Sequence, residues 1–175
     1  DYAYERPEIK QIEEKFIKLL DKFENAASFD EQDSAMEEIN EMRRDFETLA
    51  SLVNVRHTID TTDTYYETEN DHIDEITPIY EGLISKYYQA LVDSKYKKEL
   101  QEKWGSYIFD VARTRLKTFS PAVIEDMQKE NKLASQYTKL RASAKINFQG
   151  EERNLSQMTP FMESSDREVR KQANE

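Results

Sequence analysis

The sequence has no cysteine, two histidines, three glycines and four prolines. Without cysteine the chain can form neither a disulfide framework nor a thiol nucleophile. This fits a reducing compartment, so we expect a cytoplasmic location. No run of apolar residues approaches the roughly 20 residues that a membrane-spanning helix needs, so we expect no membrane partner.

The 175 residues are 37% hydrophobic and 35% charged. This mixture is typical of an all-α protein in which each helix buries one stripe, and eight Phe and ten Tyr provide bulky core side chains. The net charge of −11 repels phosphate backbones, so we expect no nucleic-acid partner. Residues 94–141 are basic and the residues before them acidic. We interpret these charges as solvated helix faces; alternatively, the basic segment packs beside the acidic one or lines a cavity for charged ligands.

Apolar residues recur at three- and four-residue steps from the beginning of the chain and predict two long helices. The first has Pro7 in its first turn, where proline is tolerated, and extends to about Ala26. A capping box formed by Ser28 and Glu31 then begins a second helix, which could reach Ile59.

A third helix is expected over about residues 65–91, and Pro78 should kink or break it because proline removes an internal donor. Three further helices are expected over about residues 94–104, 108–119 and 121–140. The last of these carries Ile124, Met127 and Leu133 on its apolar stripe. No Gly/Ser-rich linker separates the helices, so we expect no internal domain boundary.

The helical pattern breaks at residues 144–155, where alternating apolar residues flank a Gln-Gly pair. This pattern predicts a small β-hairpin in which Ile146 and Phe148 bury one face of the first strand. Gln149 and Gly150 lie near the turn, and we expect a positive φ at Gly150. The fold class is therefore all-α, a multi-helix bundle-like lobe with one small β-hairpin near residues 144–155.

A last helix begins at about residue 165, with Ser165 as its cap and Glu168 reciprocating. Only about ten residues follow, fewer than the roughly 12–15 at which an isolated helix becomes marginally stable. We therefore expect that this helix is truncated and that the chain is the front piece of a longer protein.

The candidates for chemistry are few, and we assign no catalytic, cofactor-binding or metal-binding residue. Glu69 and His72 have the Glu-x-x-His spacing that places two metal ligands on one helix face, but a di-iron bundle needs this motif twice. The other histidine, His57, has Asn54 at the corresponding position. The sequence has neither a glycine-rich phosphate loop nor a nucleophile elbow.

Two pairs of adjacent tyrosines, Tyr65-Tyr66 and Tyr87-Tyr88, could line a peptide groove. At helical spacing such residues more often belong to the core and its rim. The pairs therefore indicate a binding surface only as an alternative.

Several segments, in this order along the chain, together resemble the N-terminal region of the oligoendopeptidase F family. They are Arg56–Asp63, Lys117–Pro121, Glu130–Leu133, Tyr137–Leu140, Asn154–Gln157 and Ser165–Arg170. The resemblance extends over essentially the whole chain from Tyr4 to Glu175. These proteins are zinc metallopeptidases related to thimet oligopeptidase, and the resemblance implies an almost entirely helical, two-lobed enzyme with a deep channel. The family's zinc ligands, a His-Glu-x-x-His motif and a downstream Glu, do not occur in this sequence.

The resemblance implies that residues 1–175 are the N-terminal helical lobe of a larger zinc-dependent oligoendopeptidase. This enzyme would hydrolyse internal bonds of short peptides, and the present lobe would form part of the substrate channel. Its expected partners are short peptide substrates and the C-terminal catalytic lobe, which would hold the zinc. The alternative is a stand-alone helical module that binds a protein or peptide through a tyrosine-lined groove.

Overall fold

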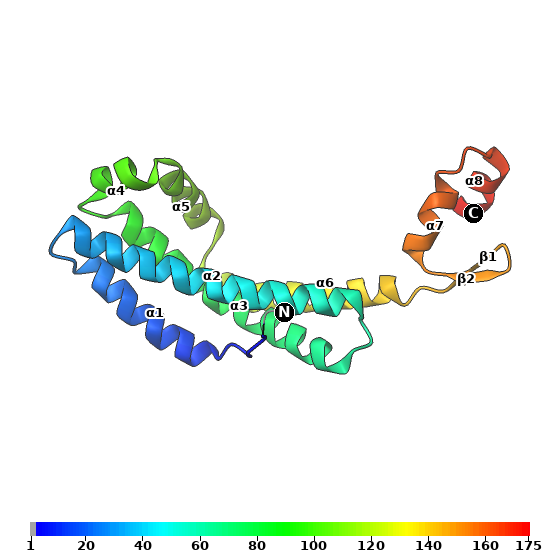
Figure 1. Cartoon of the computed structure of the whole chain (residues 1–175), viewed down its shortest axis with the longest axis horizontal. Coiled ribbons are helices and arrows are strands. Elements are labelled where there is room, and N and C mark those ends of the chain that lie inside the picture. The colour runs from blue at the N-terminus through cyan, green and yellow to red at the C-terminus, as the bar shows by residue number, and fades with distance from the viewer. Residues whose placement is uncertain (1–2) are drawn as a thin grey trace. The chain divides into compact units, whose positions relative to one another are not determined.

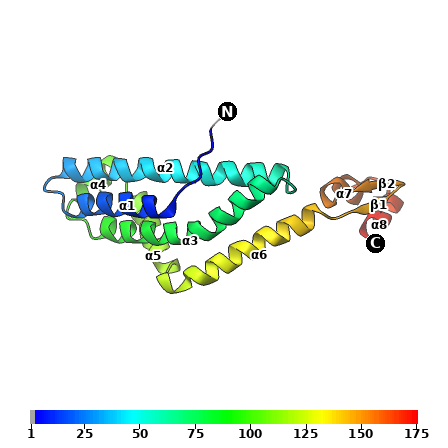
Figure 2. The same cartoon turned by 90° about the horizontal axis from the view of Figure 1, so that it is seen from below.

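The computed structural model describes residues 3–175 and contains eight α-helices, one 3₁₀ turn and one two-stranded hairpin in that range. This confirms the all-α class with one small hairpin. The elements are α1 (Ile9–Glu24), α2 (Phe29–Ile59), α3 (Thr64–Val92), α4 (Lys97–Trp104), α5 (Tyr107–Thr118), η1 (Pro121–Val123), α6 (Ile124–Ala142), β1 (Ile146–Phe148), β2 (Glu151–Arg153), α7 (Leu155–Met162) and α8 (Arg167–Asn174). Figures 1 and 2 show them in two views.

The chain divides into two compact units, with the boundary between Asn131 and Lys132. This differs from the expectation of no internal boundary, which rests on the lack of a linker. The boundary has no linker signal because it lies inside the continuous helix α6. None of the described helices is both long and apolar enough to cross a membrane.

The core of unit 1 lies where α1, α2 and α3 pack against one another, with α5 on α3 (Figure 1). The apolar stripe expected on α1 is confirmed, since Phe16, Leu19, Leu20 and Phe23 are buried. Phe23 meets the ring of Tyr87 from α3 edge-on, with 5.6 Å between ring centroids. Helix α1 begins later than expected, at Ile9, so Pro7 precedes it and is not in its first turn.

Polar side chains begin the second and third helices. The Ser28 hydroxyl accepts from the N–H of Glu31, as expected of a capping box. The Glu31 carboxylate reaches one residue further back than in that motif and accepts from the N–H of Ala27 at 2.8 Å. Asp63 begins α3 by accepting from the N–H groups of Tyr65 and Tyr66.

Helix α3 continues through Pro78, and Figure 2 shows its axis bending about midway. Pro78 has no N–H to donate to the carbonyl of Asp74, four residues earlier. The Asn131 side chain of α6 donates to this carbonyl at 3.1 Å. Gln128, one turn earlier on α6, donates to the neighbouring carbonyl of Glu75 at 2.7 Å. The bend thus provides the acceptors that hold the first part of α6.

Helix α6 differs from the sequence prediction in its apolar face. None of its described side chains is buried, and Leu133 is exposed instead of sharing a buried stripe with Ile124 and Met127. The predicted stripe does not form because Leu133 lies nine residues after Ile124, which at 100° per residue is about 180° away on the helix.

In unit 2, Phe148 is buried, with 5.1 Å between the centroids of its ring and that of Phe161 on α7. Ile146 is only half-buried, so the expected face of β1 is buried at Phe148 and in part at Ile146. The strands pair antiparallel, with Phe148 opposite Glu151. Both turn residues, Gln149 and Gly150, have positive φ, +53° and +82°, which is typical of a type I′ turn. The prediction for Gly150 is confirmed, whereas the positive φ of Gln149 is not evident from the sequence.

The region after the hairpin forms two further helices. Asn154 and Gln157 form a reciprocal capping box that begins α7, and this helix includes Pro160. The last helix begins at Arg167, and its cap is Asp166, which accepts from the N–H groups of Glu168 and Val169. The expected cap, Ser165, is therefore wrong by one residue; an aspartate carboxylate accepts both bonds more strongly than a serine hydroxyl.

Candidate functional site

Unit 1 contains a cavity of about 580 Å³ between α2, α3, α5 and the beginning of α6. Its apolar residues include Phe46 of α2 and Tyr80 of α3, whose rings stack with 3.9 Å between centroids. Phe119, after α5, and Met127 of α6 add further apolar surface. An apolar base of this kind can bury an apolar group of a ligand.

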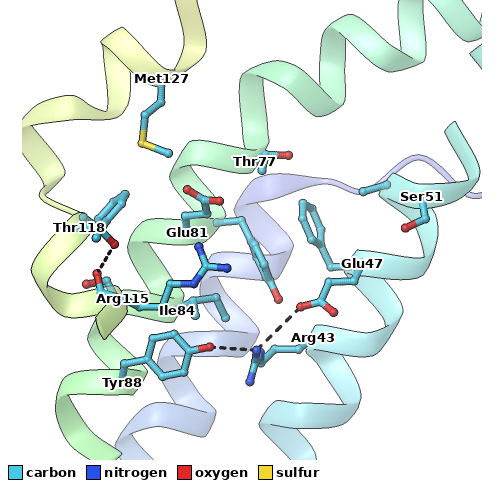
Figure 3. Close-up of a pocket in the computed structure, with 15 residues that line it drawn as sticks. Arg43, Glu47, Ser51, Thr77, Glu81, Ile84, Tyr88, Arg115, Thr118 and Met127 are labelled. Carbon is cyan, nitrogen blue, oxygen red and sulfur yellow. Dashed lines mark hydrogen bonds and ion pairs between the residues drawn. The ribbon is translucent and has the colours of Figure 1, made fainter. Parts of the chain in front are cut away.

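The polar residues of the cavity have both signs of charge, and Arg43 lies beside Tyr88 and Glu47 (Figure 3). The Arg43 guanidinium donates to the Tyr88 hydroxyl at 3.2 Å and to the Asn40 side-chain oxygen at 3.2 Å. Its distance to the Glu47 carboxylate is 3.9 Å, a loose ion pair. Arg43 is thus held between α2 and α3 before any ligand is present.

On the other side of the cavity, Glu81 of α3 and Arg115 of α5 provide a second pair of opposite charges (Figure 3). Partial burial raises the pKa of the Glu81 carboxyl, and the positive charge of Arg115 opposes this shift. Both groups line the cavity, so it presents a hydrogen-bond acceptor and a donor close to apolar surface.

The lining of the cavity also includes hydroxyl groups, on Ser51, Ser85, Thr77 and Thr118, and contains no histidine. Burial raises the pKa of Tyr80, with the nearby Arg43 guanidinium opposing, so this phenol keeps its proton at neutral pH.

The structure uses the Glu-x-x-His pair differently from a metal site. The buried Glu69 carboxylate accepts from the Tyr4 hydroxyl at 2.6 Å and lies 3.5 Å from the Arg6 guanidinium. His72 Nε2 is 2.9 Å from the carbonyl oxygen of Pro7. These two side chains therefore attach the segment before α1 to α3.

His57 is buried on α2 and belongs to no cluster with Glu69 and His72. Across residues 3–175, no group of three or more His, Cys, Asp or Glu side chains could hold a metal ion.

The tyrosine pairs have separate environments. Tyr87 is in the core, Tyr88 lines the cavity, and Tyr65 is exposed at the beginning of α3. A single tyrosine-lined groove from both pairs therefore does not form. The cavity residues Arg43, Glu81 and Arg115 were not predicted, because they come from three helices and charged residues at helical spacing usually mark solvated faces.

A family model for the peptidase M3 N-terminal domain matches residues 1–119. The chain belongs to this family. Among curated proteins, none matches the chain.

Solved structures agree with this assignment. One protein described as oligoendopeptidase F is 51% identical, with a TM-score of 0.94. PZ peptidase A with an inhibitor is 50% identical, also with a TM-score of 0.94. A protein from Bacillus anthracis str. Ames, also described as an oligoendopeptidase F, is 48% identical, with a TM-score of 0.93. Each match covers 99% of this chain but only 31–32% of the other chain, so this chain spans about a third of the length of these proteins.

Proposed function

We propose that the chain is the N-terminal, channel-forming lobe of a zinc-dependent oligoendopeptidase that hydrolyses internal bonds of short peptides. The observation that carries the proposal is the match to the M3 N-terminal domain, together with about 50% identity to peptidases three times as long. The partners in this proposal are short peptides and a C-terminal catalytic lobe. The cytoplasmic location expected from the cysteine-free sequence belongs to the same proposal.

In this proposal the zinc is bound outside residues 1–175, since the described residues offer no ligand cluster. Zinc in such an enzyme activates water and polarises the peptide carbonyl. The residues of this chain contribute binding. The cavity around Arg43, Glu81 and Arg115 would hold part of an extended peptide and present charged groups to its backbone or termini.

The first experiment compares this chain with the longer polypeptide that contains it, using an internally quenched peptide of about ten residues. We expect cleavage by the longer polypeptide, loss of cleavage with a zinc chelator, and recovery when zinc is restored. This chain alone should neither cleave the peptide nor retain stoichiometric zinc after dialysis. If the longer polypeptide shows no cleavage, the peptidase proposal fails and the binding-module alternative gains support.

A second experiment tests the channel role with two arginines that lie two residues apart on α5. Arg115 lines the cavity, whereas Arg113 pairs with Asp110 on the surface of the same helix at 2.6 Å. Arg115→Ala in the active enzyme should raise KM for peptides with little change in kcat, because the cavity binds and does not catalyse. Arg113→Ala is the control and should leave KM unchanged. Equal effects of the two substitutions would contradict the channel role.

A further inference from the structure

Helix α6 has an apolar stripe that the described residues do not cover. Leu133, Tyr137 and Leu140 are 65%, 61% and 69% exposed. Their spacing of four and three residues places them on one face of the helix, over a length of roughly 10 Å. Large apolar residues gathered on one helix face typically mark a contact with another element.

The stripe is on a different side of α6 from the residues that contact α3. Gln128 and Asn131 donate to the carbonyls at the Pro78 bend. At 100° per residue, the mean direction of the stripe is about 180° from that of these two amides. Helix α6 therefore contacts α3 through one face and carries the exposed stripe on the opposite face.

The surroundings of the stripe suit burial. Between Leu133 and Leu140 the face has no charged residue, because Tyr137 fills the intermediate position. The Arg141 guanidinium lies 5.7 Å from the centroid of the Tyr137 ring. A long arginine side chain can keep this contact while its charged group stays at the edge of a buried surface.

We propose that Leu133, Tyr137 and Leu140 form the docking surface for the part of the polypeptide that the solved relatives have and this chain lacks. The inference rests on the proposed function, in which a catalytic lobe follows this chain. The relatives share the fold over 99% of this chain and are about three times as long. Their additional residues are the occupant that the stripe would contact.

The size of the stripe favours a covalently joined partner over an independent one. A stable interface between separate proteins buries about 800 Å² on each partner, usually with roughly 20–30 residues a side. Three side chains provide much less. A segment of the same polypeptide needs less contact area, because the covalent connection gives it a high effective concentration.

The absence of cysteine from this chain allows a specific test by thiol labelling. Leu140→Cys introduces a thiol in the stripe, and Thr138→Cys introduces one on a different face of α6, where Thr138 is also exposed. Each variant is made in this chain alone and in the longer polypeptide. The rate of maleimide labelling at the introduced cysteine is followed by mass spectrometry, and peptide cleavage by the longer polypeptide is measured in parallel.

We expect the thiol of the Leu140→Cys variant to be labelled roughly tenfold or more slowly in the longer polypeptide than in this chain, because labelling of a covered thiol requires local opening. The thiol of the Thr138→Cys control should be labelled at similar rates in both. Equal rates for the Leu140→Cys variant would overturn the docking proposal, even if the longer polypeptide cleaves peptide.

The same labelling data separate docking from the peptidase activity. Protection of the thiol introduced at position 140 without cleavage of the peptide would support docking and contradict the peptidase proposal. Protection in this chain alone that increases with its concentration would identify a second copy as the occupant and overturn the inference.

Discussion

The coupling free energy between Asn131 and Pro78 can be measured by a double-mutant cycle. Asn131→Ala removes one hydrogen bond to the Asp74 carbonyl, with a net contribution of about 1 kcal/mol. Alanine has a higher helix propensity than asparagine by about 0.5 kcal/mol, which offsets part of this loss. In the chain that keeps Pro78, Asn131→Ala should therefore lower the free energy of unfolding by about 0.5 kcal/mol.

In the Pro78→Ala background, Asn131→Ala should change the free energy of unfolding in the opposite direction. The alanine introduced at position 78 has an N–H that can donate to the Asp74 carbonyl within α3, so Asn131 is no longer required as a donor. Only the propensity difference then remains, and Asn131→Ala should stabilise by about 0.5 kcal/mol. The coupling energy between the two positions is thus about 1 kcal/mol, or about 2–4 °C in Tm for a chain of this size.

The assay is urea unfolding followed by the fluorescence of Trp104, the single tryptophan, which is in the same unit as Pro78 and Asn131. Gln136→Ala, at an exposed position of α6, is the matched control and should show no coupling with Pro78→Ala. If Asn131→Ala has the same sign and size in both backgrounds, the amide does not compensate for the donor that proline lacks. Our explanation of how α6 is held would then be incorrect.

Two further predictions concern the cavity and the hairpin. Burial raises the pKa of Glu81, so the folded state favours the protonated carboxyl. The stability that this protonated form contributes is lost as the pH rises above 4.5, the ordinary pKa of a glutamate, and through the raised pKa of the folded state. Glu81→Gln should therefore increase the Tm at pH 7 by more than at pH 4; an equal shift at both values would show that ionisation of Glu81 has no influence. In the hairpin, Gln149→Asn should stabilise unit 2, because asparagine tolerates positive φ better, whereas Gly150→Ala should destabilise it by about 1 kcal/mol. Hydrogen exchange at residues 146–153 measures both effects, and unchanged protection would argue against the type I′ turn.

The hairpin and all the helices except α7 could be predicted from the sequence because they depend on local periodicity and capping. The helix from residue 29 to Ile59 and the strand with Phe148 both follow from such patterns. The errors are also local: Asp166 and Ser165 are both good caps, and their neighbours do not decide between them. The sequence prediction places Leu133 on one stripe with Ile124 and Met127, but nine positions separate Leu133 from Ile124 and rotate it to the opposite side of the helix.

The cavity could not be predicted from the sequence. Arg43 and Tyr88 are 45 residues apart, and their contact depends on how α2 and α3 are aligned. Arg115 contributes from a third helix. Each of these residues alone resembles an ordinary solvated charge or rim residue, so the site becomes visible only when the helices are packed.

The attachment of Tyr4 to Glu69 has a consequence for folding during synthesis. The two residues are 65 positions apart. At about 5–20 residues per second, Tyr4 leaves the ribosome about 3–13 s before its acceptor does. Throughout this time the segment before α1 has no binding site, and it can be fixed only after the beginning of α3 has emerged. One of the earliest segments of this chain to be synthesised therefore acquires these native contacts only after 65 further residues have been made.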